Sequence, residues 1–277
     1  MDHRIAERFN AARWLLEANA TRAGKLAYID DHTRLDYGGL ADRVRRAAAG
    51  LLAMGLRREE RVLLLMHDSI DFPVAFLGAL HAGIVPVPVN TLLTTADYAY
   101  MLQHCGAQAA IVSPALWPML REALAQARCA APVLAAGTGP APDGTRSLAS
   151  LQSAAPLAAA ADTGADDIAF WLYSSGSTGR PKGTVHTHAN LHWTAELYGK
   201  AVLGLRESDI VFSAAKLFFA YGLGNALTFP LSVGAPQKTV TPCSVQRLKT
   251  AAGVGRSAIR TVVAPTDSGK VSALPRP

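Results

Sequence analysis

Disulfide frameworks, zinc ribbons and membrane spans are not expected, because this 277-residue chain has little of what each of them needs. Its three cysteines (Cys105, Cys129 and Cys243) form no Cys-x-x-Cys pair. The best apolar run, 62–66, is far too short to cross a bilayer, and the charged N-terminus shows no signal-peptide pattern. We therefore expect a cytoplasmic protein with reduced thiols and no membrane association.

The basic residues lack the aromatic partners that nucleic-acid surfaces usually contain. The chain has 27 Lys and Arg against 21 Asp and Glu, but seven of the basic residues and only one acid lie in residues 236–277. Residues 1–235 are therefore balanced, and residues 236–277 contain no aromatic residue at all. Nucleic-acid binding usually combines basic residues with aromatics or spreads them over a folded face. We expect no nucleic-acid partner.

The chain does contain a regular alternation of strand-like and helix-like segments. Strands are expected at 26–29, 61–66, 85–89 and 109–112, with two prolines placing 85–89 at a sheet edge. Helices are expected over 40–52, 71–81, 94–104 and 116–127. Further along, strands are expected at 168–172 and 209–213, and helices at 190–202 and 222–233, the last interrupted by Pro230. This alternation predicts an α/β fold with mostly parallel sheets flanked by helices.

Eleven residues between two strand-like segments carry most of the functional information. They run Tyr173-Ser-Ser-Gly-Ser-Thr-Gly-Arg-Pro-Lys-Gly183. Glycines let backbone N–H groups converge on phosphate oxygens, while hydroxyls add donors and Lys182 adds a positive charge. The segment predicts a nucleotide-phosphate loop, formed by Ser174, Ser175, Gly176, Ser177, Thr178, Gly179 and Lys182.

The loop is not a Walker A motif. Counted from Gly176, Pro181 stands where that motif has its second glycine, and Gly183 stands where it has Ser or Thr. Proline removes the N–H group that would contact phosphate. A polar linker is the plain alternative, but linkers rarely end in Arg-Pro-Lys-Gly between two apolar strands.

The uninterrupted run from Tyr173 to Gly183 resembles the signature loop of the acyl-adenylate-forming (AMP-binding) superfamily, which includes acyl-CoA synthetases, luciferases and adenylation domains. The segments 212–225, 170–173 and 85–94 resemble the benzoate–CoA ligase branch, and the similarity covers residues 9–235. One departure is Gly39, where the family often has a glutamate. The fold this implies is the N-terminal part of an acyl-adenylate-forming domain.

The resemblance implies an ATP-dependent aryl-acid–CoA ligase that uses ATP, Mg²⁺ and CoA. The acid attacks the ATP α-phosphate to form an acyl-adenylate, and the CoA thiol then displaces AMP. Ala220, Tyr221 and Gly222 would border the pocket for a small aromatic carboxylic acid. From the residues alone, the nearby aromatics Phe218, Phe219 and Tyr221 are at least as compatible with an ordinary core. The oligomeric state is not indicated.

Three other patterns carry less weight. His186, His188 and His192 span a strand-to-helix transition and do not match zinc-ligand spacing, so no metal site is expected. Residues 253–258 fit G-x-G-x-x-A without a preceding strand. There is also no G-x-S-x-G elbow, which a hydrolase of that type would need.

The similarity stops near Ala235. We expect a first α/β subdomain over 1–165, the start of a second over 166–235, and a basic unpatterned segment over 236–277 that is out of frame or disordered. On this interpretation the chain is truncated, lacks the family's catalytic lysine and is inactive alone. Alternatives are a fragment of another acyl- or amino-acid-adenylating enzyme, or a non-catalytic binding protein.

Overall fold

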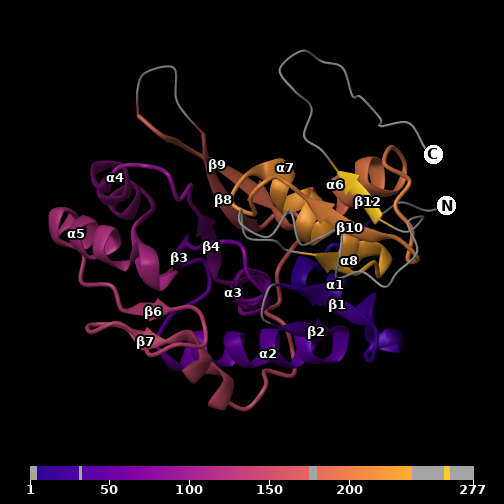
Figure 1. The fold of residues 1–277 in the computed structure, drawn as a ribbon, viewed down its shortest axis with the longest axis horizontal. Coiled ribbons are helices and arrows are strands. Elements are labelled where there is room, and N and C mark those ends of the chain that lie inside the picture. The colour runs from indigo at the N-terminus through magenta and orange to yellow at the C-terminus, as the bar shows by residue number, and fades with distance from the viewer. Residues whose placement is uncertain (1–4, 31–32, 175–179, 239–258, 263–277) are drawn as a thin grey trace.

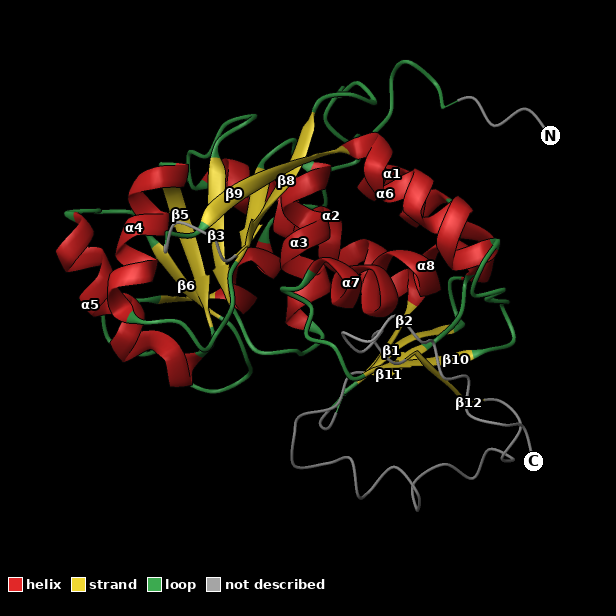
Figure 2. Cartoon of the chain, turned by 90° about the horizontal axis from the view of Figure 1, so that it is seen from above, coloured by secondary structure: helices red, strands yellow, loops and turns green. Residues whose placement is uncertain are grey.

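The computed structural model describes residues 5–30, 33–174 and 180–238, together with the backbone of 259–262. Figures 1 and 2 show two groups of strands, each accompanied by helices. This arrangement confirms the predicted α/β fold. None of the helices in the described ranges is long and apolar enough to cross a membrane.

The first sheet is parallel throughout. Its strand order is β4 (Val85–Pro88), β3 (Arg61–Leu65), β5 (Ala107–Val112), β6 (Val133–Ala135) and β7 (Arg146–Ser147). β4 lies at the edge, as its two prolines predicted, because proline lacks the N–H group that a central strand needs. β6 and β7 have only three and two residues, and their short patterns were missed in the sequence.

Helices cover both faces of this sheet. On one face, α2 (Tyr37–Ala53) and α3 (Asp71–His81) share a buried cluster with Val62, Leu64 and Ile111. On the other face, α4 (Thr95–Cys105) and α5 (Trp117–Ala127) pack with Leu63, Leu65 and other strand residues. Because alternate residues of β3 enter the two clusters, the strand is buried on both sides, as expected for a parallel sheet.

Several helix ends were correctly predicted from local chemistry. Gly55, at φ +95°, follows the C-terminus of α2, and Gly83, at φ +73°, follows that of α3. Thr94 and Asp97 form a reciprocal capping box at the start of α4. The Thr94 side chain accepts from the Asp97 N–H group at 3.2 Å, and the Thr94 N–H group donates to the Asp97 carboxylate at 3.0 Å.

The second sheet joins distant parts of the chain. Its strand order is β12 (Ile259–Val262), β10 (Ile210–Ser213), β11 (Gln237–Lys238), β1 (Leu26–Ile29) and β2 (Arg34–Asp36). Only the β1–β2 pair is antiparallel. β1, from before residue 165, thus pairs with β11 in the 236–277 segment, and β12 in that segment pairs with β10. Most of that segment lies outside the described residues, so its expected disorder and the subdomain boundaries stay predictions.

A separate antiparallel hairpin carries the phosphate-loop motif. It consists of β8 (Ile168–Ser174) and β9 (Lys182–Thr187), and β8 lies against the edge strand β4. Figure 1 shows the hairpin rising between the helices α4 and α7. The remaining short elements before the hairpin are α1 (Ala11–Glu17), η1 (Ala20–Arg22), η2 (Pro114–Leu116) and η3 (Leu148–Ser153).

The helices after the hairpin differ from the expected ones in how they are divided. The helix expected at 190–202 is α6 (His188–Thr194) followed by the π-helix η4 (Ala195–Lys200). The helix expected at 222–233 is α7 (Ala220–Leu223), the π-helix η5 (Gly224–Thr228) and α8 (Phe229–Val233). Pro230 does not break this run, because it lies in the first turn of α8, where a missing N–H group costs little.

Candidate nucleotide and acid site

The two ends of the predicted phosphate loop lie side by side. Ser174 closes β8, Lys182 opens β9, and the two residues are direct partners in the antiparallel register. Both are exposed. The hairpin therefore holds a hydroxyl and an ammonium group at the base of the loop. Ser175, Gly176, Ser177, Thr178 and Gly179 lie outside the described residues, so their phosphate-binding role stays a prediction.

A hydrogen bond fixes the β8 side of this base to α4. The Tyr173 hydroxyl lies 2.8 Å from Nδ1 of His104. Burial raises the pKa of the Tyr173 hydroxyl well above its usual value, so this group stays protonated at neutral pH. The residue just before Ser174 is thereby tied to a helix of the first sheet.

The β9 side contacts the same helix. The guanidinium of Arg180 lies 5.8 Å from the centre of the Tyr100 ring, which stacks on the His104 ring at 5.3 Å. A Cβ added at Gly183 would lie 3.3 Å from Trp171 and 3.5 Å from His104, so the return strand passes close to these rings. Tyr100 and His104, one helical turn apart, thus contact residues on both sides of the loop.

The sequence interpretation missed Tyr100 and His104 as neighbours of the loop. The sequence shows only that these two aromatic rings are four residues apart, which places them on one face of a helix. Nothing in that spacing says that Tyr173, 69 residues further along the chain, lies against the same face.

The predicted acid-binding residues lie at the start of α7. Phe219 precedes this helix and is 39% exposed, and Tyr221 is 47% exposed. Their rings lie parallel at 5.9 Å, whereas Phe218 is buried. The aromatic run therefore contains both core and surface members, which the sequence alone had not separated. Ala220 is exposed beside them, and Gly222 is buried.

Glycine is required at position 222 by the packing. A Cβ there would lie 1.9 Å from the carbonyl oxygen of Lys216 and 2.7 Å from its carbonyl carbon. These atoms belong to the backbone and have no rotamer that removes the clash. Gly222 thus lets the start of α7 pack directly on the segment before it.

A buried carboxylate anchors that preceding segment. Oδ1 of Asp68 accepts a hydrogen bond from the Leu217 N–H group at 3.1 Å, and Oδ2 lies 3.5 Å from the Lys216 ammonium. Burial raises the pKa of Asp68, while the Lys216 charge and the backbone hydrogen bond oppose this shift. Asp68 follows β3, so the first sheet helps to position the predicted acid-binding wall. No sequence motif pointed to it.

The three histidines near the hairpin serve separate packing roles. His186 stacks on Phe170 at 4.5 Å. His188 is buried and accepts a hydrogen bond from the Ala11 N–H group at 3.1 Å, and burial lowers its pKa to about 4. His192 packs edge-on against Trp14 at 4.9 Å. In the ranges that the structure describes, no three His, Cys, Asp or Glu side chains come together as a metal-binding group.

The fold and the hairpin together define an α/β domain of the kind found in adenylate-forming enzymes. Solved structures of that class superimpose on most of the chain. The chain belongs to the AMP-binding enzyme family, which matches residues 15–257. The match passes residue 235, where the similarity was expected to stop.

The relatives point to aromatic-acid ligases. A benzoate–CoA ligase from Thauera aromatica is 50% identical over 236 residues, covering 84% of this chain and 44% of the relative. The structure of a benzoate CoA ligase from Burkholderia xenovorans LB400 has a TM-score of 0.77 at 56% identity, covering 84% of this chain and 45% of that one. The anthranilate CoA ligase AuaEII, solved with anthranoyl-AMP, has a TM-score of 0.81 at 34% identity over the same shares. The chain thus spans less than half the length of these relatives.

Proposed function

We propose that this chain supplies the ATP phosphate loop and one wall of the acid pocket of an ATP-dependent aryl-acid–CoA ligase. The observation that carries the proposal is the β8–β9 hairpin, which pairs Ser174 with Lys182 at the base of the signature loop. The 50% identity to a benzoate–CoA ligase supports the aromatic substrate class.

In the proposed reaction the acid carboxylate attacks the ATP α-phosphate and pyrophosphate leaves, which gives the acyl-adenylate. A CoA thiol then attacks the acyl carbon and AMP leaves. The first step needs the two reactants in line and the phosphate charge compensated. The Lys182 ammonium provides charge at the loop base, and the Ser174 hydroxyl provides a donor beside it. The contacts of Tyr100 and His104 hold both sides of that base.

Magnesium is part of the proposal through the family alone. When bound, it would compensate charge on the ATP phosphates. In the described ranges no three His, Cys, Asp or Glu side chains come together, so a bound magnesium ion would be held mainly through the ATP phosphates. A cytoplasmic location is likewise proposed from the cysteine usage of the sequence.

The acid pocket wall is proposed to be the surface around Tyr221. Parallel, partly exposed rings at Phe219 and Tyr221 offer an apolar surface for a flat ring, and Ala220 leaves room beside them.

The test is a binding panel on the 277-residue chain, because the chain spans less than half of its relatives. Saturation-transfer NMR in the presence of ATP would compare benzoate and hydroxybenzoates with octanoate and phenylalanine. We expect the benzoates to bind, and Tyr221→Ala to weaken benzoate binding without changing ATP binding. Tyr198→Ala, which removes a ring of similar exposure on η4, is the matched control.

Each outcome of the panel separates one account from another. Preferential binding of octanoate or of phenylalanine would replace the aryl-acid proposal with another adenylate-former. Binding of ATP and of none of the acids would favour a non-catalytic binding protein. We expect no acid-dependent AMP formation by the chain alone, and robust benzoyl-CoA synthesis would contradict that expectation.

A further inference from the structure

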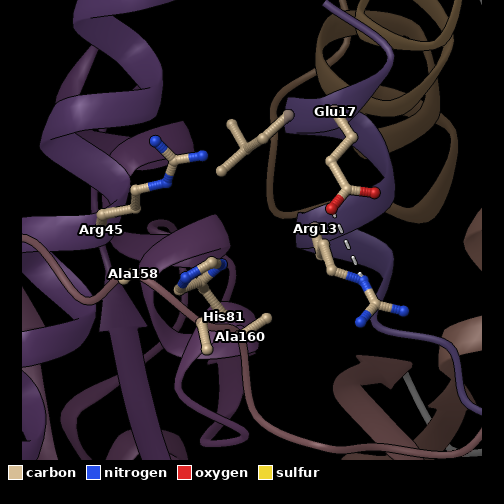
Figure 3. A pocket seen from close by; sticks show the side chains of 8 residues that line it. Arg13, Glu17, Arg45, His81, Ala158 and Ala160 are labelled. Atoms are coloured by element: carbon tan, nitrogen blue, oxygen red, sulfur yellow. Dashed lines mark ion pairs between the residues drawn. The ribbon is translucent and has the colours of Figure 1, made fainter. Parts of the chain in front are cut away.

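The part of the chain around the first sheet is closed by its own side chains. Figure 3 shows a cavity of about 260 Å³ that is lined by residues of α1, α2 and α3 and by 158–160. Arg13 and Glu17 are paired with each other there at 4.0 Å. The unpaired Nε of Arg45 and Nδ1 of His81 are buried, so the cavity presents neither atom to a ligand.

The second sheet has one face that is covered by helices. Tyr28, Gln237 and Val211 are register partners across β1, β11 and β10, so their side chains point to the same face. All three are at most 1% exposed. The Tyr28 hydroxyl donates to the Ala226 carbonyl oxygen on η5 at 3.1 Å, and Val211 packs with Phe229 of α8. The run from α7 to α8 therefore covers this face.

The opposite face of the second sheet carries the next set of register partners. Ile29, Lys238 and Phe212 follow the three buried residues by one position, so they point the other way, as does Ile210, two residues before Phe212. All four side chains are only half-buried, although three of them are apolar. Figure 2 shows α7 and α8 on one side of this sheet and none of the described helices on the other. We call the face defined by Ile29, Ile210 and Phe212 the open face.

A parallel sheet is expected to have helices on both faces, because helical crossover connections lie there. The first sheet follows this rule, with α2 and α3 on one face and α4 and α5 on the other. In the second sheet, β12, β10, β11 and β1 are parallel neighbours, so the open face is where a second helical layer is expected. A second copy of the chain would instead place sheet against sheet, an arrangement typical of sandwiches of antiparallel strands. The element that fits the open face is therefore helical.

We propose that the open face is a docking surface for the part of an aryl-acid–CoA ligase that this chain does not match, acting as a separate chain and contributing an apolar helical layer. The chain spans less than half the length of the aromatic-acid ligases it resembles, so more than half of such a ligase is available as the partner. The inference rests on the proposed ligase function, because that function names the partner.

The test co-expresses the affinity-tagged 277-residue chain with the part of the Thauera aromatica ligase that lies outside the 236 matched residues. Co-expression is used because that part need not fold alone. We expect a one-to-one complex in size-exclusion chromatography with light scattering. Hydroxyl-radical oxidation of Phe212 should fall roughly fivefold or more in the complex, since a side chain in the core of an interface is shielded from solvent. Oxidation of Met119, on α5, is the internal reference and should not change.

A pair of variants locates the contact on the open face. Phe212→Asp should weaken the association at least about tenfold, because a charge buried against apolar groups is not compensated. Leu52→Asp makes the same change at an exposed apolar residue of α2 and should leave the association unchanged. Urea unfolding checks that both variants fold, and the oxidation of Phe212 in the wild-type chain depends on no substitution.

Each outcome decides between accounts. Failure to recover the ligase part with the chain, equal Phe212 oxidation with and without it, or equal association of Phe212→Asp would overturn the proposal. A homodimer of the isolated chain that Phe212→Asp abolishes would replace the partner with a second copy. Acid-dependent AMP formation by the complex tests the ligase function separately: a complex that forms no AMP would contradict that function and leave the docking surface intact.

Discussion

Replacing Gly222 by alanine is expected to destabilise the protein because the new methyl group has no space. The added Cβ would lie 1.9 Å from the Lys216 oxygen and 3.1 Å from the Ala215 carbonyl carbon. The segment cannot easily move away, because its Leu217 N–H group is held by the buried Asp68 carboxylate. Overpacking of this kind typically costs about 1–3 kcal/mol, and backbone contacts place Gly222→Ala at the upper end.

Urea unfolding followed by circular dichroism would measure this loss. A cost of about 3 kcal/mol raises the unfolding equilibrium constant by roughly 100-fold, at about 1.4 kcal/mol for each factor of ten. Gly24→Ala is the matched control, because a Cβ there meets nothing within 4 Å. It should change the free energy of unfolding by less than about 0.5 kcal/mol. Equal stability of Gly222→Ala and the wild type would refute the packing argument.

Three further predictions concern positions around the site. Tyr173→Phe removes the hydroxyl that shares a hydrogen bond with His104 and should cost about 0.5–1.5 kcal/mol in urea unfolding, whereas an unchanged midpoint would show that the bond contributes nothing. Thr94→Ala breaks the capping box with Asp97 and should cost about 1 kcal/mol, with Thr94→Ser largely restoring it. Burial raises the pKa of Asp68 above 3.8, so the folded wild type gives up its proton at higher pH than the unfolded chain does. Its free energy of unfolding should therefore fall relative to Asp68→Asn as pH rises through that window, and parallel pH profiles would contradict this.

The elements with strong local patterns could be predicted from the sequence. The helix expected at 71–81 is α3, residue for residue, since glycine follows it and its apolar residues are continuous. The edge position of β4 followed from its two prolines. The strands β6 and β7 could not be predicted, because two or three residues contain no period. Their formation depends on neighbouring strands, since β6 pairs with the edge of β5 and β7 pairs with β6.

The π-helix η5 shows a second limit of sequence reasoning. Pro230 was expected to interrupt a single helix, but the interruption lies earlier, at 224–228. Gly224 packs so closely on Phe229 that a Cβ would lie 2.6 Å from the ring. The wider turn brings this glycine against the ring, and α8 then starts with proline in its first turn. The contact between Gly224 and Phe229 depends on the width of the π-helical turn between them. Helix propensities of single residues do not predict such a turn.

The candidate site likewise has one part that the sequence predicts and another part that it does not. Its loop has a contiguous motif, so Ser174 and Lys182 were predicted as loop ends, and the register pairs them. The supports of the site come from elsewhere in the chain. Asp68 is 149 residues from Leu217, and His104 is 69 residues from Tyr173. Such pairs depend on how β3, α4 and the hairpin assemble, and one sequence contains no signal for that.

The most direct test of the phosphate-loop account is a titration of the 277-residue chain with ATP, comparing the wild type with Lys182→Met. A charge-assisted hydrogen bond contributes about 1.5–3 kcal/mol, so we expect ATP binding to weaken by roughly 10- to 100-fold. Lys200→Met, which removes a lysine paired with Glu196 on η4, should leave ATP binding unchanged. Equal ATP affinity in the wild type and Lys182→Met would contradict the assignment of this hairpin as the phosphate loop.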